Sequence, residues 1–212
     1  LNDLQKHEFL TIIREQSHQL QEIADAFFTN HQLANERVEV SITPTSLRGV
    51  VRDAIERVSR SMPERAGELE GIVRDVSASS RALADRRALV GVVALLLENA
   101  IKYGSPPFTI TTEQQGGTIA LLVRDEGPGI ESYHHVRIFD PFYRIDVDMR
   151  SGVGGAGLGL FTARKLVEAM HGVVRVRSSP GKGATFIVEL PAAPSESGEG
   201  DDEQGSSLRL VI

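Results

Sequence analysis

The stretch Gly152–Leu160, GVGGAGLGL, raises the first question about the fold, because its glycines include the spacing Gly152-x-Gly154-x-x-Gly157. That spacing is the dinucleotide-binding fingerprint, which requires a strand directly before the first glycine within a βαβ unit. The preceding residues, Asp146–Ser151, are charged and have no strand pattern, and the chain after the glycines is predicted to return as a hairpin. A Walker loop is excluded too, because no Gly-Lys-Ser/Thr closes the run.

The glycine run nevertheless suits a phosphate group. Gly155, Gly157 and Gly159 let the backbone approach an anion closely, and they lie at the start of a predicted helix, 157–170, whose free N–H groups point outward. A glycine loop before a helix is common by itself, so this interpretation depends on polar residues elsewhere in the chain.

A polar trio occurs in Leu97–Tyr103, LENAIKY, near the end of a strongly apolar predicted helix. Asn99, Lys102 and Tyr103 are spaced i, i+3 and i+4, and therefore share one helix face. An amide oxygen can ligate Mg²⁺, a lysine can meet a phosphate, and a tyrosine can cover a base. Each residue alone reads as an ordinary surface residue, but three of them on an apolar helix indicate a site.

A second candidate is Asp125–Ile130, DEGPGI, which directly follows a predicted strand. Asp125 lies at the strand end, where its carboxylate can accept a hydrogen bond from the amino group of a base. Gly127 and Gly129 permit positive φ around Pro128 and keep side chains away from a ligand. The plain alternative is an ordinary turn.

A third candidate is Arg137–Arg144, RIFDPFYR, in a loop-rich middle region. Its aromatic residues can dock the loop as a hinged flap, and Arg144 can reach a phosphate. The alternative is that Phe139 and Phe142 simply belong to the core.

Composition and charge exclude several classes. The chain has 212 residues, 41% of them hydrophobic, which suits one domain with an appendage, and it has no cysteine, so disulfides and thiol catalysis are excluded. The net charge is −6; residues 192–212 carry five acidic residues and one Arg, which leaves the rest near −2, without the basic footprint of a nucleic-acid-binding protein. The longest apolar run, Ala88–Leu97, is too short for a membrane span.

The patterns predict helices and antiparallel hairpins, an α+β fold. The predicted strands are 37–42 (ended by Pro44), 71–76, 81–84, 108–113, 118–125, 173–178 and 184–190. The predicted helices are 47–58, capped by Thr45 or Ser46, 85–103, capped by Asp85, and 157–170. Residues 61–67 are predicted to form a loop. A heptad seam from Leu10 to Phe27 predicts either a helix packed on its own domain or, as we favour, a dimerising helix. We expect three parts: a bundle-forming helix in 1–35, the main domain in 36–191 and a disordered acidic tail in 192–212.

Together, the ordered motifs resemble the ATP-binding domain of sensor histidine kinases, in the superfamily that includes gyrase and mismatch-repair ATPases. LLENAIKY resembles the N box, DEGPGI and GAGLGL the two glycine boxes, FDPFYR the F box, and GKGATF, residues 181–186, the last, Thr-containing box. The resemblance runs from about residue 8 to residue 190. It implies a Bergerat-type fold, a layer of helices over a mixed, mostly antiparallel sheet.

The resemblance also implies roles for individual residues. Asp125 would bond the adenine amino group, Asn99 would hold Mg²⁺, and Tyr103 would stack near adenine. Lys102 would contact phosphate, and the glycine run would wrap the phosphates below a mobile lid, about 143–154. The implied catalytic residues are Asn99, Lys102 and Arg144, and the implied ATP-binding residues are Asn99, Lys102, Tyr103, Asp125, Gly127, Gly129, Gly155, Gly157, Leu158, Gly159 and Thr185.

The sequence departs from the family at two places. Leu95 stands four residues before Asn99, where hydrolysing relatives have a Glu that activates water. Glu98 is next to Asn99 in sequence but points about 100° away from it on the helix. Phosphoryl transfer is therefore favoured over hydrolysis. The second departure concerns the histidine that accepts the phosphate, which in the family is usually followed by Glu and, soon after, Pro. His7-Glu8 has no Pro after it, and His18 lies beside the heptad seam. We therefore expect a fragment that begins after its acceptor helix.

The implied function is transfer of the ATP γ-phosphate to a histidine outside this chain, for relay to a response regulator. The implied partners are that regulator, the acceptor-histidine helix of the same kinase and a second copy of the chain, with no nucleic acid. The implied location is cytoplasmic, with a membrane involved only through upstream segments. Two alternatives remain: a serine kinase of the anti-sigma type, against which the heptad seam speaks, and a nucleotide-sensing dimerisation module without catalysis.

Overall fold

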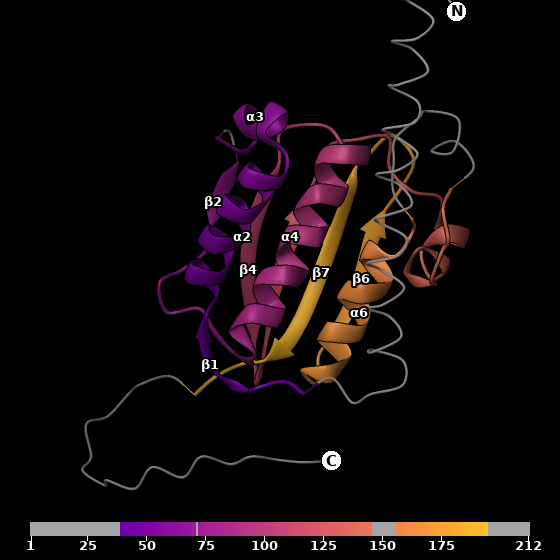
Figure 1. The fold of residues 1–212 in the computed structure, drawn as a ribbon. Helices are drawn as coiled ribbons and strands as arrows, with labels where there is room; N and C mark the ends of the chain where they lie inside the picture. The colour runs from indigo at the N-terminus through magenta and orange to yellow at the C-terminus, as the bar shows by residue number, and fades with distance from the viewer. Residues whose placement is uncertain (1–38, 71, 146–155, 195–212) are drawn as a thin grey trace, which may run out of the picture.

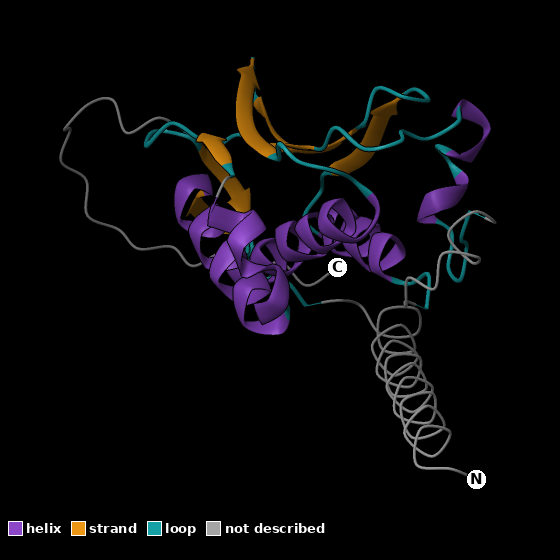
Figure 2. Cartoon of the chain, turned by 90° about the horizontal axis from the view of Figure 1, so that it is seen from above, coloured by secondary structure: helices purple, strands orange, loops and turns teal. Residues whose placement is uncertain are grey.

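The computed structural model describes residues 39–70, 72–145 and 156–194. The helices α2 (Leu47–Ser61), α4 (Arg86–Tyr103) and α6 (Gly159–Ala169) form one layer over a five-stranded sheet (Figure 1). Seen from above, the helices lie together on one side of the strands (Figure 2). The predicted α+β fold is therefore confirmed. The predicted bundle helix, 1–35, and residues 195–212 of the predicted disordered tail lie outside the described residues. The tail prediction begins too early, because Ala192 bridges Ala82 and Ala193 is buried.

The large sheet has the order β2-β4-β5-β7-β6. β4 (Thr109–Gln115), β5 (Thr118–Arg124), β7 (Ala184–Pro191) and β6 (Val173–Ser178) pair antiparallel, and β2 (Val73–Asp75) joins β4 in parallel. The sheet is thus mixed and mostly antiparallel, as predicted. A separate two-stranded sheet pairs β1 (Thr43–Ser46) with β3 (Arg81–Ala84).

The face of the sheet that packs against the helices is apolar. Ile110, Val123 and Phe186 are aligned across β4, β5 and β7, and each is at most 1% exposed. Because side chains alternate along a strand, their neighbours Arg124 and Thr185 lie on the opposite face, away from the helices. The helix layer therefore packs on the apolar set alone.

Caps set the starts of the two long helices. The Asp85 carboxylate accepts a hydrogen bond from the N–H of Ala88 at 2.9 Å, and the Ser46 hydroxyl accepts one from Gly49 at 3.4 Å. Both satisfy N–H groups that have no partner inside the helix. α4 ends at Gly104, whose N–H donates to the carbonyl of Ala100 at 2.8 Å. The predicted caps are confirmed, Ser46 being the cap of α2.

The predicted strand 37–42 is wrong over its described part, because residues 39–42 form no strand and the strand is Thr43–Ser46, which includes Pro44; residues 37 and 38 lie outside the described ranges. Proline has no N–H to donate, but among the described strands β1 pairs only with β3, so Pro44 lies on an edge strand where that loss is tolerated. The predicted loop 61–67 is also wrong in part. It contains the 3₁₀ helix η1 (Pro63–Arg65) and leads into α3 (Ala66–Glu70), where Arg65 bonds both Glu68 and the carbonyl of Ile101.

The middle region contains two short 3₁₀ helices, η2 (Ser132–His134) and η3 (Arg137–Phe139). α6 begins at Gly159, two residues later than predicted, because Gly157 has φ +70° and cannot be helical. Within the described ranges, no helix combines the length and apolar character needed to cross a membrane.

Candidate functional site

A cleft of about 930 Å³ opens between α4, the start of α6 and the end of β5. It is lined by residues more than 60 positions apart in the sequence, which the fold brings together from both predicted glycine segments and from α4. The predicted site residues among its lining are Asn99, Lys102, Tyr103, Asp125, Gly129, Arg144, Gly157, Leu158 and Gly159.

Three other predicted residues do not line the cleft or cannot be placed there. Thr185 alternates along β7 with Ala184 and Phe186, which do line the cleft, so its side chain lies on the opposite face of the sheet. Gly127 is not among the lining residues either, but it contacts Asp125 from behind. Gly155 falls outside the described residues, as does most of the predicted lid.

Asp125 is the buried polar group of the cleft, with only 4% of its surface exposed. Its Oδ1 accepts hydrogen bonds from the N–H of Gly127 at 2.8 Å and of Ala184 at 3.4 Å. Burial raises the pKa of this carboxyl, and the two backbone donors partly offset the increase. Since both side-chain bonds to described residues end on Oδ1, Oδ2 is available to accept a bond from an amino group of a ligand.

Two glycines press against this carboxylate. A Cβ on Gly104 would lie 2.6 Å from Cγ of Asp125, and a Cβ on Gly127 would lie 2.9 Å from its Oδ1. Any larger residue at either position would displace the side chain. Sequence reasoning assigned Gly104 only to the end of a helix and missed this contact; the pattern that could have indicated it is a glycine directly after the polar trio.

The last turns of α4 supply the polar trio. Asn99, Lys102 and Tyr103 are half-buried and all line the cleft. Leu95 lines the cleft on the same helix face, and its Cδ2 lies 3.6 Å from the position of a Cβ on Gly159. Glu98 is also at the cleft, where its carboxylate accepts a hydrogen bond from Ser61 of α2 at 3.3 Å.

The far wall comes from η2, η3 and the turn after them. His134 Nδ1 and the Tyr143 hydroxyl are 2.5 Å apart, and the Arg137 guanidinium lies 4.4 Å from the centre of the Tyr143 ring. Of the two aromatic residues with a core alternative, Phe139 is buried against Phe186, whereas Phe142 is 60% exposed.

The turn is bonded to the second glycine segment. The N–H of Phe142 donates to the carbonyl of Gly157 at 3.0 Å. Gly157 has φ +70°, and a Cβ there would lie 2.9 Å from the Tyr143 carbonyl oxygen. The chain is therefore held together at this point on both sides of residues 146–155.

A metal ion would have few protein ligands here. Among the described residues, no group of three His, Cys, Asp or Glu side chains could hold a metal. Asn99 lines the cleft with an amide side chain, and its carbonyl oxygen is a hard ligand. Mg²⁺ commonly keeps several waters and binds through one or two protein ligands and substrate phosphates, so a single Asn fits Mg²⁺ with a nucleotide better than a metal alone.

Comparisons with known proteins agree with this geometry. Residues 84–194 match the family described as histidine kinase-, DNA gyrase B-, and HSP90-like ATPase. The chain is 32% identical over 193 residues to the sensor-like histidine kinase SenX3 of Mycolicibacterium smegmatis, covering 85% of this chain and 50% of that protein. It is 37% identical over 102 residues to the sensor protein SrrB of Staphylococcus aureus, covering 47% of this chain and 18% of SrrB.

Solved structures show the same architecture. Full-length ShkA in complex with AMPPNP superposes with a TM-score of 0.70 at 29% identity, covering 91% of this chain and 40% of ShkA. The Acinetobacter baumannii histidine kinase AdeS has the same fold, with a TM-score of 0.63 at 21% identity over 90% of this chain and 85% of AdeS. The chain spans half the length of SenX3 and less of SrrB. It belongs to the histidine kinase-, DNA gyrase B- and HSP90-like ATPase family and corresponds to the catalytic ATP-binding domain of sensor histidine kinases.

Proposed function

We propose that this chain binds ATP with Mg²⁺ in the cleft and transfers the γ-phosphate to a histidine that is not its own, for relay to a response regulator. The observation that carries the proposal is Asp125. It is a buried carboxylate whose Oδ2 accepts no hydrogen bond from the described part of the chain, in the same cleft as an amide, a lysine and the first residue of a helix.

The base of the nucleotide would bind at the Asp125 end. Oδ2 accepts a hydrogen bond from the adenine amino group, and Tyr103 supplies an aromatic surface at the same end of α4. Gly104 and Gly127 leave room for the carboxylate and for the base beside it. Adenine recognition by a buried acceptor is specific, because a ligand without the amino group would leave the carboxylate unpaired.

The phosphates would lie toward α6. The backbone N–H groups at Leu158 and Gly159 begin an 11-residue helix and have no partner inside it, so they suit phosphate oxygens. Lys102 and Arg144 line the same cleft and carry positive charge, and Gly155 would extend the phosphate wrap. Asn99 would hold Mg²⁺, which neutralises phosphate charge when bound.

Phosphoryl transfer is favoured over hydrolysis by the side chains around Asn99. Leu95 occupies the place on α4 where a base could activate water, and it has no proton acceptor. Glu98 is one residue from Asn99, and its carboxylate bonds Ser61 of α2. A water molecule at the terminal phosphate would therefore lack a base from this helix face.

The whole protein would be a dimeric sensor kinase. The SenX3 match covers 85% of the chain, more than the ATPase family match over residues 84–194, which favours a kinase with the predicted bundle helix over a serine kinase without one. We assign residues 1–35 to the second helix of a dimerisation hairpin in a homodimer, with a response regulator as the downstream partner. The catalytic domain would then work on the cytoplasmic side.

The test is nucleotide binding and transfer by the Asp125→Asn variant. Asparagine keeps the oxygen that accepts from Gly127 but turns an amino group toward adenine. We expect calorimetry to show at least a tenfold loss of ATP affinity, while Asp75→Asn, at an exposed strand residue, binds normally. Unchanged affinity in Asp125→Asn would refute the site.

Transfer is tested with the acceptor hairpin of SenX3 supplied separately. With ATP labelled at the γ-phosphate, we expect label on the hairpin that is lost in acid, and little release of inorganic phosphate without the hairpin. Acid-stable label on the hairpin, or steady phosphate release in its absence, would contradict histidine phosphorylation.

A further inference from the structure

A second hollow, separate from the nucleotide cleft, lies at the N-terminal end of α2. It has a volume of about 670 Å³ and shares no lining residue with the cleft. We call it the arginine groove; it is lined by Ser46, Arg48, Gly49, Val51, Arg52, Arg74, Val76 and Arg86. Half of these residues are arginines and none is acidic, although the chain as a whole has a net charge of −6.

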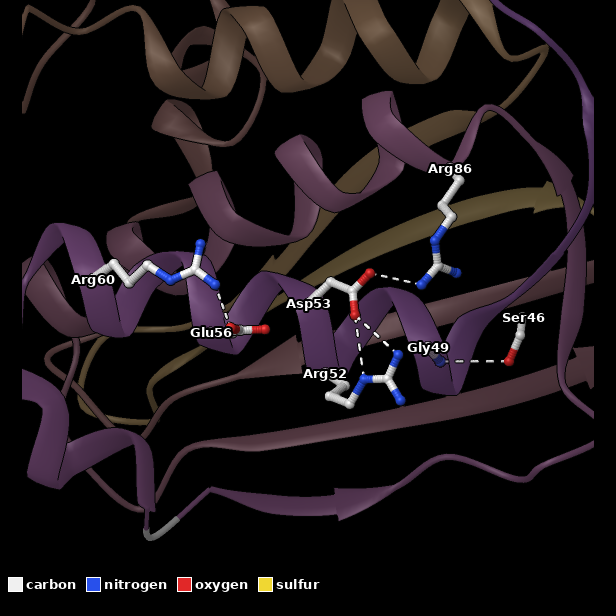
Figure 3. A network of polar contacts seen from close by, with 7 residues as sticks. All are labelled: Ser46, Gly49, Arg52, Asp53, Glu56, Arg60 and Arg86. Atoms are coloured by element: carbon white, nitrogen blue, oxygen red, sulfur yellow. Dashed lines mark hydrogen bonds and ion pairs between the residues drawn. The ribbon is translucent and has the colours of Figure 1, made fainter.

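The nearby carboxylate does not neutralise this charge. Asp53 bonds Arg52 at 3.2 Å and Arg86 at 2.6 Å, so a single carboxylate serves two guanidiniums (Figure 3). Arg48 and Arg74, from α2 and β2, add two further exposed guanidiniums. With one carboxylate among four guanidiniums, the hollow keeps a positive charge that a further anion would offset.

The described chain ends close to this groove. After β7, Ala192 bridges Ala82 of β3, and the N–H of Ala193 donates to the carbonyl of Arg81 at 3.0 Å. On its other side, β3 pairs with β1, where Arg81 lies opposite Ser46, a lining residue of the groove. In Figure 1 the yellow end of the described chain lies at the same end of the molecule as β1, and β3 lies between the two.

The sequence that follows is acidic. Residues 196–203 carry five carboxylates: Glu196, Glu199, Asp201, Asp202 and Glu203. They begin two residues after Pro194, and an extended chain advances about 3.3 Å per residue. The five carboxylates therefore lie within about 30 Å of chain from Pro194, enough to cross β3 and β1 and reach the arginines.

We propose that the acidic segment 196–203 docks in the arginine groove of the same chain, with its carboxylates paired to the guanidiniums of Arg48, Arg52, Arg74 and Arg86. Tethering favours this occupant over a free anion, because the segment is held next to the groove at a high effective concentration. Arginine suits it, since the planar guanidinium binds carboxylates through two parallel hydrogen bonds. The docked segment would cover the starts of α2 and α4, at the opposite end of α4 from Asn99.

The test uses the whole chain, which has no cysteine, so a single introduced cysteine can be labelled selectively. A single Ser206→Cys substitution takes a spin label just beyond the acidic segment, and nuclear relaxation locates the label relative to each backbone amide. With the native segment, we expect line broadening of amides at Arg48, Gly49 and Arg74. Broadening there should fall at least about twofold when the five acids become Gln or Asn, or in 0.5 M salt, where screening acts beyond about 4 Å.

Charge reversal supplies the matched control. The double variant Arg48→Glu, Arg74→Glu should abolish the broadening. Replacing the five acidic residues by Lys in that double variant should restore it. Arg60→Glu, on the same helix but outside the groove, should leave it unchanged. Equal broadening with acidic and neutral segments, or broadening centred on another face, would overturn the proposal. The segment variants decide the question even where a groove variant does not fold.

Discussion

At the residue scale, Asp125 is a buried carboxyl whose ionisation costs stability. Burial raises its pKa above the ordinary value of 3.8, so the ionised form is disfavoured in the folded state. Below the unfolded pKa, both states are protonated and no penalty exists. As the pH rises through the unfolded and then the raised folded pKa, the unfolded state releases its proton first and stability is lost.

The first prediction follows from that sign. Asp125→Asn cannot ionise and keeps the acceptor for Gly127, so its stability should equal that of the wild type near pH 3 and exceed it at pH 7. Thermal unfolding followed by circular dichroism across this range measures the difference. If Asp125→Asn instead became less stable than the wild type as the pH rises, the carboxylate would be shown to stabilise the fold. Nucleotide affinity should fall in the same variant, which separates binding from folding.

Gly157 yields the second prediction. Alanine there would adopt the strained φ of +70° and would place Cβ 2.9 Å from the Tyr143 carbonyl oxygen. Gly181 is the control, because its φ is +74° but no atom lies within 4 Å of its Cβ position. Gly181→Ala should lower the free energy of unfolding by about 1 kcal/mol, and Gly157→Ala by about 2–3 kcal/mol, in urea titrations. Equal losses would mean that the Tyr143 contact relaxes without cost.

The same scale shows what sequence can predict about the site. Asn99, Lys102 and Asp125 were predicted from residue type and from position on one helix face or at a strand end, and all three line the cleft. Thr185 was assigned through resemblance, and the alternation of β7 turns it away from the cleft. Gly104 was missed because its role depends on Asp125, which is distant in sequence.

At the element scale, elements with a strong local pattern were predicted well. The α4 boundaries follow from Asp85 at the start and Gly104 at the end, and β4–β7 follow from the alternation of apolar residues. β1 and α3 were not predicted, because they are short and depend on partners. β1 needs β3, and the η1–α3 segment is fixed to α4 by the bond from Arg65 to Ile101.

The cap of α4 gives the third prediction. The Asp85 carboxylate accepts from the N–H of Ala88 and from the N–H of Ser41, both at 2.9 Å. Asp85→Ala should lower the free energy of unfolding by about 1–2 kcal/mol, more than Ser46→Ala, whose bond to Gly49 is longer at 3.4 Å. Urea unfolding measures both. Affinity for ATP should not change, because the cap and the polar trio lie at opposite ends of α4; a parallel loss of affinity would contradict this.

At the scale of the whole molecule, the cleft is assembled from segments that are far apart in the sequence. Local patterns predict each wall but not their meeting, which depends on β5 and β7 pairing and on α4 and α6 packing over the same sheet. The parallel pairing of β2 with β4 was likewise not predictable, because no short turn joins them. Only the order of several motifs, taken together, indicated a common site.

The last prediction asks which reaction this assembled cleft supports. Leu95 lines the cleft beside Gly159, and in the proposed site it stands where a base would activate water. Leu95→Glu should raise the release of phosphate from ATP about 100-fold, because a positioned base contributes roughly that much, while Leu95→Gln should not. Both variants should lose a similar stability, about 1–3 kcal/mol, since each places a polar group against the start of α6. Equal hydrolysis by the two variants, measured at saturating ATP, would show that the missing base is not what limits water attack.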